Sequence, residues 1–181
     1  MRRAMWCVAA GILLAAALLP GCRASSVKGG AMNLTSTSFQ GSKIPARFTC
    51  SGAGVSPQLA WSAPPAGTAG FALVVTDPDA PRGTFVHWVL YDLAAGTRAL
   101  PEGVPTLGQL DDGSRQGRND FGEIGYGGPC PPPGSAHHYH FMLYALDAKL
   151  NLAVGATRAQ VEASMQGHIL ARGELVGLYQ R

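Results

Sequence analysis

Short runs of β-branched and aromatic residues, separated by turn-forming Gly, Pro, Asp and Ser, recur along most of this chain. Runs of this kind are typical of β-strands. They lie at residues 44–50, 59–62, 71–76, 85–93, 138–146 and 174–179. The runs do not alternate regularly with helical patterns, which argues against a parallel βαβ sheet. We therefore predict a mainly β fold, of the β-rich α+β class.

One segment has the pattern of a helix, at residues 157–171. Thr157 is a candidate N-cap, and Val161, Met165 and Ile169 recur at four-residue spacing on one helical face. Gly173 is a candidate stop signal just after it. The sequence therefore predicts one peripheral helix packed on a sheet, followed by the last strand.

A long segment rich in Gly and Pro separates the middle of the chain from the strand at 138–146. Of the 36 residues from 101 to 136, 15 are Gly or Pro, which is too many for regular structure. Loops of that length in a compact domain are usually either functional or disordered. Because prolines restrict the backbone near Cys130, we expect an ordered loop that forms the rim of a site.

The N-terminus has the pattern of an export signal. Arg2 and Arg3 precede an apolar run over residues 6–19, which is too short to span a bilayer as a helix. The run ends in Leu-Pro-Gly-Cys, which resembles the lipobox of bacterial lipoproteins and would make Cys22 the lipidated first residue of the mature chain. The alternative is a secreted protein without a lipid anchor.

These patterns divide the chain into three parts. Residues 1–21 are the expected lipoprotein signal peptide, residues 22–31 the lipidated Cys and a flexible tether of small residues, and residues 32–181 one folded domain. The expected location is the bacterial cell envelope, facing the periplasm or exterior and anchored to a membrane. Removal of residues 1–21 takes away two of the 14 Lys and Arg and none of the 11 Asp and Glu, which leaves a charge of +1. This balance gives no indication of nucleic-acid binding.

Two cysteines are left over once the signal peptide and the anchor are accounted for. Cys7 is removed with the signal, Cys22 carries the lipid, and Cys50 and Cys130 remain. Because exported proteins meet an oxidising compartment, a disulfide between Cys50 and Cys130 is favoured over two free thiols.

Polar side chains occur in phase with the apolar faces of three predicted strands. Asp77 continues the alternate set of residues 71, 73 and 75, and Asp79 follows two residues later. His87 is in phase with residues 85, 89 and 91, while His137 and Tyr139 share a face with residues 141, 143 and 145. Such groups could line one pocket. The alternative is that each is a satisfied polar residue at a strand end.

Two short motifs resemble the signature regions of the phosphatidylethanolamine-binding protein family, in its bacterial Raf-kinase-inhibitor-like branch. The first is Asp-Pro-Asp-Ala-Pro at residues 77–81, followed by His-Trp at 87–88. The second is Gly-Pro-Cys-Pro-Pro-Pro-Gly at 128–134, followed by His-His-Tyr at 137–139. Further similar segments lie at 48–52, 116–122 and 167–170, and the resemblance covers residues 34–179.

The resemblance implies two antiparallel sheets with peripheral helices and a small surface pocket for phosphate-type anions or phospholipid headgroups. By motif position, the pocket would be lined by Asp77, Asp79, Pro81, His87, Pro131, Pro132, His137 and Tyr139. His138 departs from the family, which usually has Arg there. A His that is near neutral at pH 7 does not fully replace the fixed contacts of an Arg, which changes the charge and stability of the rim.

The function expected from these features is a membrane-anchored binding protein for a small phosphorylated or other anionic ligand, with no cofactor and no metal. Imidazoles, a phenol and backbone N–H groups can donate to an anion, while the carboxylates orient the imidazoles or meet a cationic amine. One alternative is an inhibitor of a protease or kinase through protein contact. The other is a hydrolase that uses His and Asp, although no Gly-x-Ser-x-Gly elbow is present.

Overall fold

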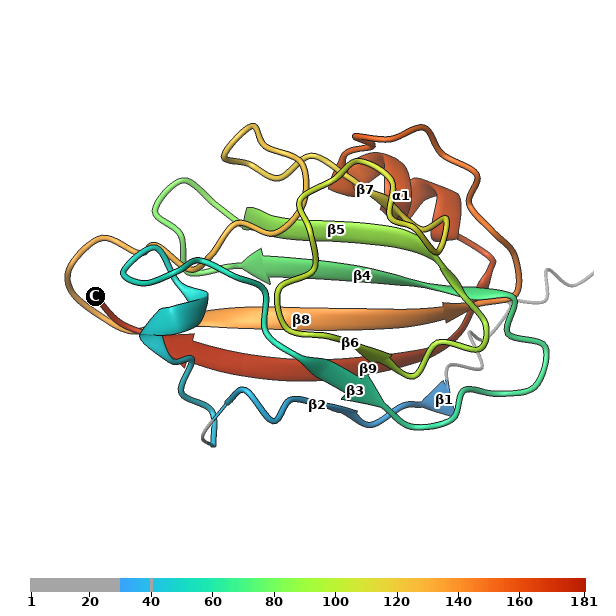
Figure 1. The fold of residues 1–181 in the computed structure, drawn as a ribbon, viewed down its shortest axis with the longest axis horizontal. Coiled ribbons are helices and arrows are strands. Elements are labelled where there is room, and N and C mark those ends of the chain that lie inside the picture. The colour runs from blue at the N-terminus through green and yellow to red at the C-terminus, as the bar shows by residue number, and fades with distance from the viewer. Residues whose placement is uncertain (1–29, 40) are drawn as a thin grey trace, which may run out of the picture.

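Two sheets share one hydrophobic core in the computed structural model, which describes residues 30–39 and 41–181 (Figure 1). Among these residues the larger sheet has the strand order β1-β9-β8-β4-β5-β7, and the smaller sheet has the order β2-β3-β6. The strands of the larger sheet are β1 Gly30–Ala31, β4 Gly70–Asp77, β5 Phe85–Ala94, β7 Arg115–Gln116, β8 His137–Leu146 and β9 Ile169–Tyr179. Those of the smaller sheet are β2 Leu34–Thr35, β3 Leu59–Trp61 and β6 Ala99–Leu100.

The predicted class is confirmed, with one correction to the sheets. Strands β4, β5, β8 and β9 pair antiparallel, as do the strands of the smaller sheet. The larger sheet is mixed rather than antiparallel, because β1 runs parallel to the edge strand β9. β1 includes Gly30 and Ala31, which lie in the segment expected to be the tether.

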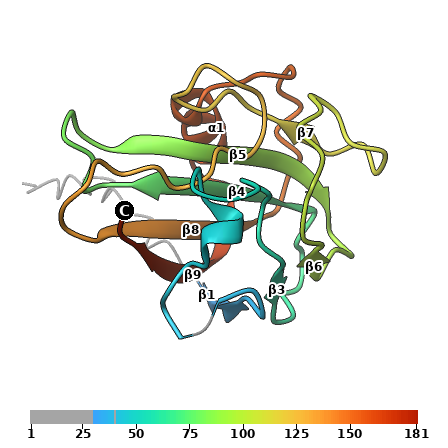
Figure 2. The same cartoon turned by 60° about the vertical axis from the view of Figure 1, so that its left-hand side comes forward.

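Both faces of the larger sheet are covered, which explains why its central strands are apolar on both sides. On one face, Leu59 and Trp61 of the smaller sheet pack with Phe71, Leu73 and Phe141 in a single cluster. On the opposite face, a second cluster joins strand residues to the helix α1, Arg158–Met165. Figure 2 shows α1 well apart from β3 and β6. Complete burial of each large apolar side chain contributes roughly 1.5–3 kcal/mol to folding.

The helix is shorter than its sequence pattern. Thr157 is the N-cap as predicted, and it forms a capping box with Gln160. However, α1 ends at Met165, and Gly167 turns the chain with a φ of +82°. Residues from Ile169 onward then pair with β8 over the full length of β9, which gives the backbone groups of β8 a partner along that edge. Pairing with β8 therefore overrides helical periodicity.

Gly173 is consequently not the end of a helix. It lies inside β9, where a Cβ atom would come within 2.9 Å of the Met32 carbonyl oxygen. The last strand accordingly begins at Ile169, five residues before the predicted start at Glu174.

Residues 44–50 do not form the predicted strand. Ile44 donates one backbone hydrogen bond to Leu178, but Pro45 has no N–H with which to continue a ladder. The chain instead forms the short 3₁₀-helix η1, Ala46–Phe48, which Thr49 closes by donating its backbone N–H and its hydroxyl to the Ala46 carbonyl oxygen. Ile44 and Phe48 are buried in the core. The apolar residues of this segment therefore attach it to the core without forming a strand.

The predicted signal peptide and the lipidation at Cys22 lie outside the described residues. Among residues 30–39 and 41–181, no helix has both the length and the apolar character needed to cross a bilayer.

Candidate functional site

A cavity of about 250 Å³ opens at the end of the larger sheet where β4 finishes and β8 begins, on the left in Figure 1. Its walls come from the ends of three strands and from two loops. The lining residues are Asp77, Ala80, Pro81, Arg82, Gly83, Phe85, His87, Phe121, Cys130, Pro131, Pro132 and His137. Six of the eight residues proposed from the sequence are in this set, so the structure brings both motifs together at one place.

Asp77 and His137 form a buried pair in this cavity. His137 Nδ1 lies 2.7 Å from Asp77 Oδ2, and the two residues are only 8% and 3% exposed. The other carboxylate oxygen, Oδ1, accepts the backbone N–H of Asp79 at 2.9 Å. Because an ionised carboxylate only accepts hydrogen bonds, His137 donates from Nδ1. Asp77 therefore orients the ring of His137 and leaves its Nε2 free for other partners.

His87 is held by the backbone of the Gly/Pro loop. Its Nδ1 lies 2.7 Å from the carbonyl oxygen of Gly127, which can only accept, so Nδ1 carries the proton. Burial lowers the pKa of His87, and this desolvation outweighs the opposing effects of the Gly127 carbonyl and the Asp77 charge. The ring is therefore held neutral and in one tautomer.

A β-bulge sets the direction of His87. Val75 pairs with Trp88, but Thr76 pairs with Val86, which leaves His87 as the extra residue. The predicted common face of residues 85, 87, 89 and 91 is therefore wrong in part. Phe85 and His87 line the cavity, whereas Val89 and Tyr91 pack in the cluster beneath α1.

Tyr139 lies behind the cavity rather than in its lining. It is fully buried in the core, and its ring meets that of His87 edge-on with centroids 5.1 Å apart. Burial raises the pKa of Tyr139, and the charge of Asp77 raises it further. The hydroxyl has no hydrogen-bond partner within the described part of the chain. Tyr139 thus supports His87 and does not face a ligand directly.

Asp79 also lies outside the lining, and it pairs with His138. The Asp79 carboxylate accepts the backbone N–H of His138 at 2.8 Å and its Nδ1–H at 2.7 Å. These contacts, led by the backbone hydrogen bond, hold the pKa of Asp79 below its usual value. His138 therefore takes a carboxylate partner at the position where the family usually has Arg. We expected both Asp residues to orient the two cavity histidines, but only Asp77 and His137 form a hydrogen bond, and His87 is held by Gly127 instead.

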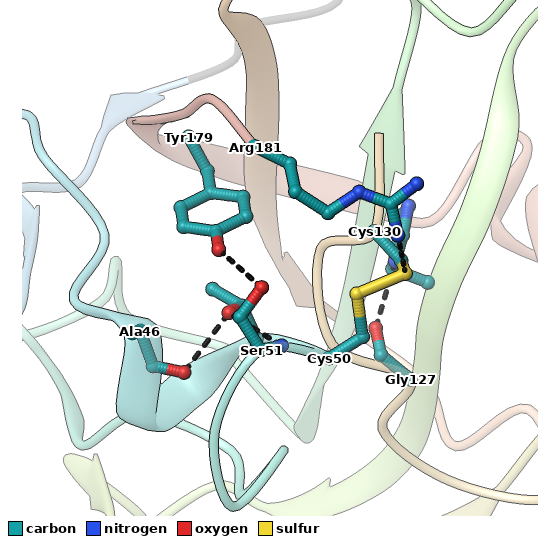
Figure 3. The surroundings of a disulfide bond; sticks show 9 residues. Ala46, Cys50, Ser51, Gly127, Cys130, Tyr179 and Arg181 are labelled. Carbon is teal, nitrogen blue, oxygen red and sulfur yellow. Dashed lines mark hydrogen bonds between the residues drawn. A yellow bond between two sulfur atoms is a disulfide. The ribbon is translucent and has the colours of Figure 1, made fainter. Parts of the chain in front are cut away.

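The predicted disulfide is confirmed and forms part of the cavity wall. Cys50 and Cys130 are joined across 80 residues with Cα atoms 5.4 Å apart. Figure 3 shows the guanidinium of Arg181 at the sulfur of Cys130, with Nη1 3.6 Å away. The bond ties the segment that carries Pro131 and Pro132 to the turn after η1. A wall made of prolines and a disulfide has little freedom to move.

The remaining lining residues were not identified as site residues from the sequence. Phe85 was seen only as part of an apolar face, and Phe121 comes from the long loop and packs edge-on to Phe85 at 4.7 Å. Phe121 is 47% exposed, an unusual position for Phe that suggests a binding role once the structure is known. Arg82 is the single Lys or Arg in the lining, and it lies in a turn where strand periodicity gives no signal.

The histidines and carboxylates do not form a metal site in the described part of the chain, where no three His, Cys, Asp or Glu side chains are grouped closely enough to hold a metal ion.

Comparison with known proteins agrees with both the fold and the motifs. The family model described as phosphatidylethanolamine-binding protein matches residues 35–180. A UPF0098 protein of Pyrococcus horikoshii is 44% identical over 164 residues, which span 89% of this chain and 82% of the relative. A Mycobacterium tuberculosis protein named as a lipoprotein, LppC, is 42% identical over 77% of this chain and 67% of its own length. The crystal structure of E. coli YbcL, described as a new member of the mammalian PEBP family, superposes with a TM-score of 0.75 at 32% identity and covers 84% of this chain and 99% of its own.

Proposed function

This chain belongs to the phosphatidylethanolamine-binding protein family, and we propose that its cavity binds a small phosphate-bearing ligand without performing chemistry on it. The observation that carries the proposal is the meeting of the Asp77–His137 pair, His87 and Arg82 around one cavity. Three nitrogen-bearing side chains and one fixed carboxylate suit a tetrahedral oxyanion better than an apolar ligand.

Arg82 supplies the positive charge that an anion requires. Its guanidinium is charged at any physiological pH, and it can offer two parallel N–H donors to a phosphate. His137 adds its Nε2, which donates whenever the ring is protonated. The negative charge of Asp77 is partly offset, because its two oxygens accept hydrogen bonds from His137 and from the backbone N–H of Asp79.

The walls of the cavity favour a small ligand. Phe85, Phe121 and the prolines are apolar, so they exclude water and strengthen the few polar contacts inside. A volume of about 250 Å³ lies below the usual range for drug-sized ligands, and it suits a headgroup or a small phosphomonoester.

The composition of the lining supports binding rather than covalent catalysis. It contains no Ser, Thr or Lys, and its Cys is held in a disulfide. Covalent catalysis by a hydroxyl, amine, thiol or carboxylate needs such a group free to attack, so the histidine nitrogens are the nucleophiles that this lining retains. Asp77, the carboxylate in the lining, is held on both oxygens.

Calorimetric titration with inorganic phosphate and phosphoethanolamine at pH 6 tests the proposal. We expect measurable binding by the wild type and a loss of about 1.5–3 kcal/mol in the His137→Ala variant, the range for hydrogen bonds to charged groups. His168→Ala is the matched control, because His168 pairs with Asp147 outside the cavity lining and is half exposed. If the wild type binds neither probe, or if His137→Ala binds as tightly as the control, the proposal is wrong.

We further propose that the domain is displayed on an exported lipoprotein. The support is the sequence that ends at Cys22 and the mycobacterial relative that is named as a lipoprotein. Cys22→Ser should move the protein from the membrane fraction to the soluble exported fraction without changing its thermal unfolding. A wild type found entirely in the soluble fraction would contradict the anchor.

A further inference from the structure

His87 presents a hydrogen-bond acceptor to the cavity, not a donor. Its Nδ1–H is committed to the Gly127 carbonyl oxygen at 2.7 Å, so the neutral ring carries only a lone pair on Nε2. The hydrogen bond to Gly127 engages Nδ1 and not Nε2, and the ring lines the cavity. Nε2 is therefore the nitrogen that a ligand can reach.

The surroundings of His87 disfavour protonation of that acceptor. The ring is 3% exposed, and it is packed between the rings of Phe85, Phe121 and Tyr139 with centroids 5.1–5.5 Å away. Burial lowers its pKa, although Asp77 and Asp120 oppose this with their negative charges. His137 and Arg82 also line the cavity. A positive charge on either of them disfavours protonation of His87.

A fully deprotonated oxyanion would place a negative oxygen against this lone pair. A phosphate monoanion avoids the conflict, because its P–OH group can donate to Nε2 while its charged oxygens face Arg82 and His137. A phosphodiester has no such proton above pH 2 or so, and a simple carboxylate has lost its proton above about pH 5. The same cavity therefore offers a means of selecting among anions.

We infer that the cavity selects phosphomonoesters, bound together with one proton shared between a phosphate oxygen and His87 Nε2, over phosphodiesters. The inference rests on the proposed function, since it names the ligand class for the same cavity. Such a cavity would bind a free monoester more tightly than the headgroup of an intact phospholipid, which is a diester.

Methyl phosphate and dimethyl phosphate, titrated calorimetrically from pH 5.5 to 8.5, test this inference on the wild-type protein. The second pKa of a phosphomonoester is about 6, so the required monoanion becomes about tenfold scarcer with each pH unit above 7. We expect methyl phosphate to bind at least tenfold more tightly than dimethyl phosphate at pH 6, and its affinity to fall roughly tenfold from pH 7 to pH 8. Dimethyl phosphate keeps one charge throughout, so its profile reports any pH effect that comes from the protein rather than from the ligand.

Two variants identify the group that senses the proton. In His87→Gln the side-chain amide can turn its N–H₂ toward the ligand, so the preference for the monoester should shrink to less than threefold. His168→Gln is the control and should keep the wild-type preference, because His168 lies outside the cavity lining. Near-UV circular dichroism of both variants checks that the aromatic packing is intact.

The outcomes separate the two proposals. If neither ligand binds the wild type, the proposed function fails. If both bind equally, or if methyl phosphate binds with no decrease from pH 7 to 8, the function stands and the selection by protonation is wrong. A preference that survives unchanged in a folded His87→Gln protein would also overturn the role of His87. If His87→Gln does not fold, the comparison of methyl phosphate with dimethyl phosphate on the wild type still tests the selection by protonation.

Discussion

Two aspartate–histidine pairs lie side by side in this molecule with the same 2.7 Å separation, yet one is buried and the other is exposed. The side chains of Asp77 and His137 are 5% and 10% exposed, whereas those of Asp79 and His138 are 42% and 53% exposed. Successive residues of β8 point to opposite faces, which separates the two histidines. The same pair of residue types thus lines the cavity in the case of Asp77 and His137, and lies on the solvated surface in the case of Asp79 and His138.

The comparison shows that burial decides what such a pair contributes. An exposed pair is screened by water and typically contributes 0–1 kcal/mol. A buried pair costs several times more when one partner is removed, because the other is left without a hydrogen bond.

Removal of the disulfide should give the largest effect. Cys50→Ser with Cys130→Ser should lower the free energy of unfolding by about 4 kcal/mol, since the bond closes a loop of 80 residues in the unfolded chain. The wall that carries Pro131 would also loosen, which would expose the Asp77–His137 pair to water. Urea unfolding of the oxidised wild type and the double variant measures the difference. A difference below 1 kcal/mol would mean that the bond is not an important restraint.

Removal of the buried carboxylate should come next. Asp77→Ala leaves the N–H of Asp79 and Nδ1 of His137 without their acceptor, and should cost roughly 2–4 kcal/mol of stability. Phosphate binding should weaken by at least about tenfold, because His137 loses its fixed orientation. Urea unfolding and calorimetry measure the two effects. Unchanged affinity in a folded variant would show that orientation of His137 is unimportant.

The contrast also explains how much of the site could be predicted from the sequence. Alternation along β8 correctly placed His137 and Tyr139 on the core face, because a regular strand keeps its period of two. It failed for β5, where the bulge at His87 changes the phase and depends on pairing with β4. Local pattern carries no information about such a partner.

Loop residues were missed for a related reason. Arg82 and Phe121 reach the cavity through turns whose direction depends on the packing of distant segments. Asp79 was assigned to the cavity because its motif lies beside Asp77, but its carboxylate is held by the start of β8, 59 residues away. The end of α1 at Met165 was missed in the same way, since pairing of β9 with β8 overrides the helical pattern.

His87 extends the comparison to a buried histidine that is held by a carbonyl. Because its pKa is lowered in the folded state, the unfolded chain takes up a proton below pH 6.5 that the native protein does not. The free energy of unfolding should therefore fall as the pH drops through 6.5, by at most about 1.4 kcal/mol per pH unit. The slope continues until native His87 is itself protonated. Chemical unfolding from pH 7.5 to 5 should show a shallower slope in His87→Gln, and parallel curves would contradict the assignment.

The smallest effect should come from the exposed pair. Asp79→Asn should cost less than about 1 kcal/mol at pH 7, because both side chains are solvated and water replaces much of the interaction. The pKa of Asp79 is lowered in the folded state, so its contribution is present above the unfolded value of about 3.8 and is lost as the pH falls through the folded value. The difference between wild type and variant should therefore begin to shrink as the pH falls below about 3.8 and disappear below the folded pKa. Phosphate affinity should change less than twofold, since Asp79 does not line the cavity. A loss of stability or affinity equal to that of Asp77→Ala would mean that the two pairs act as one unit, and that exposure is not what separates their roles.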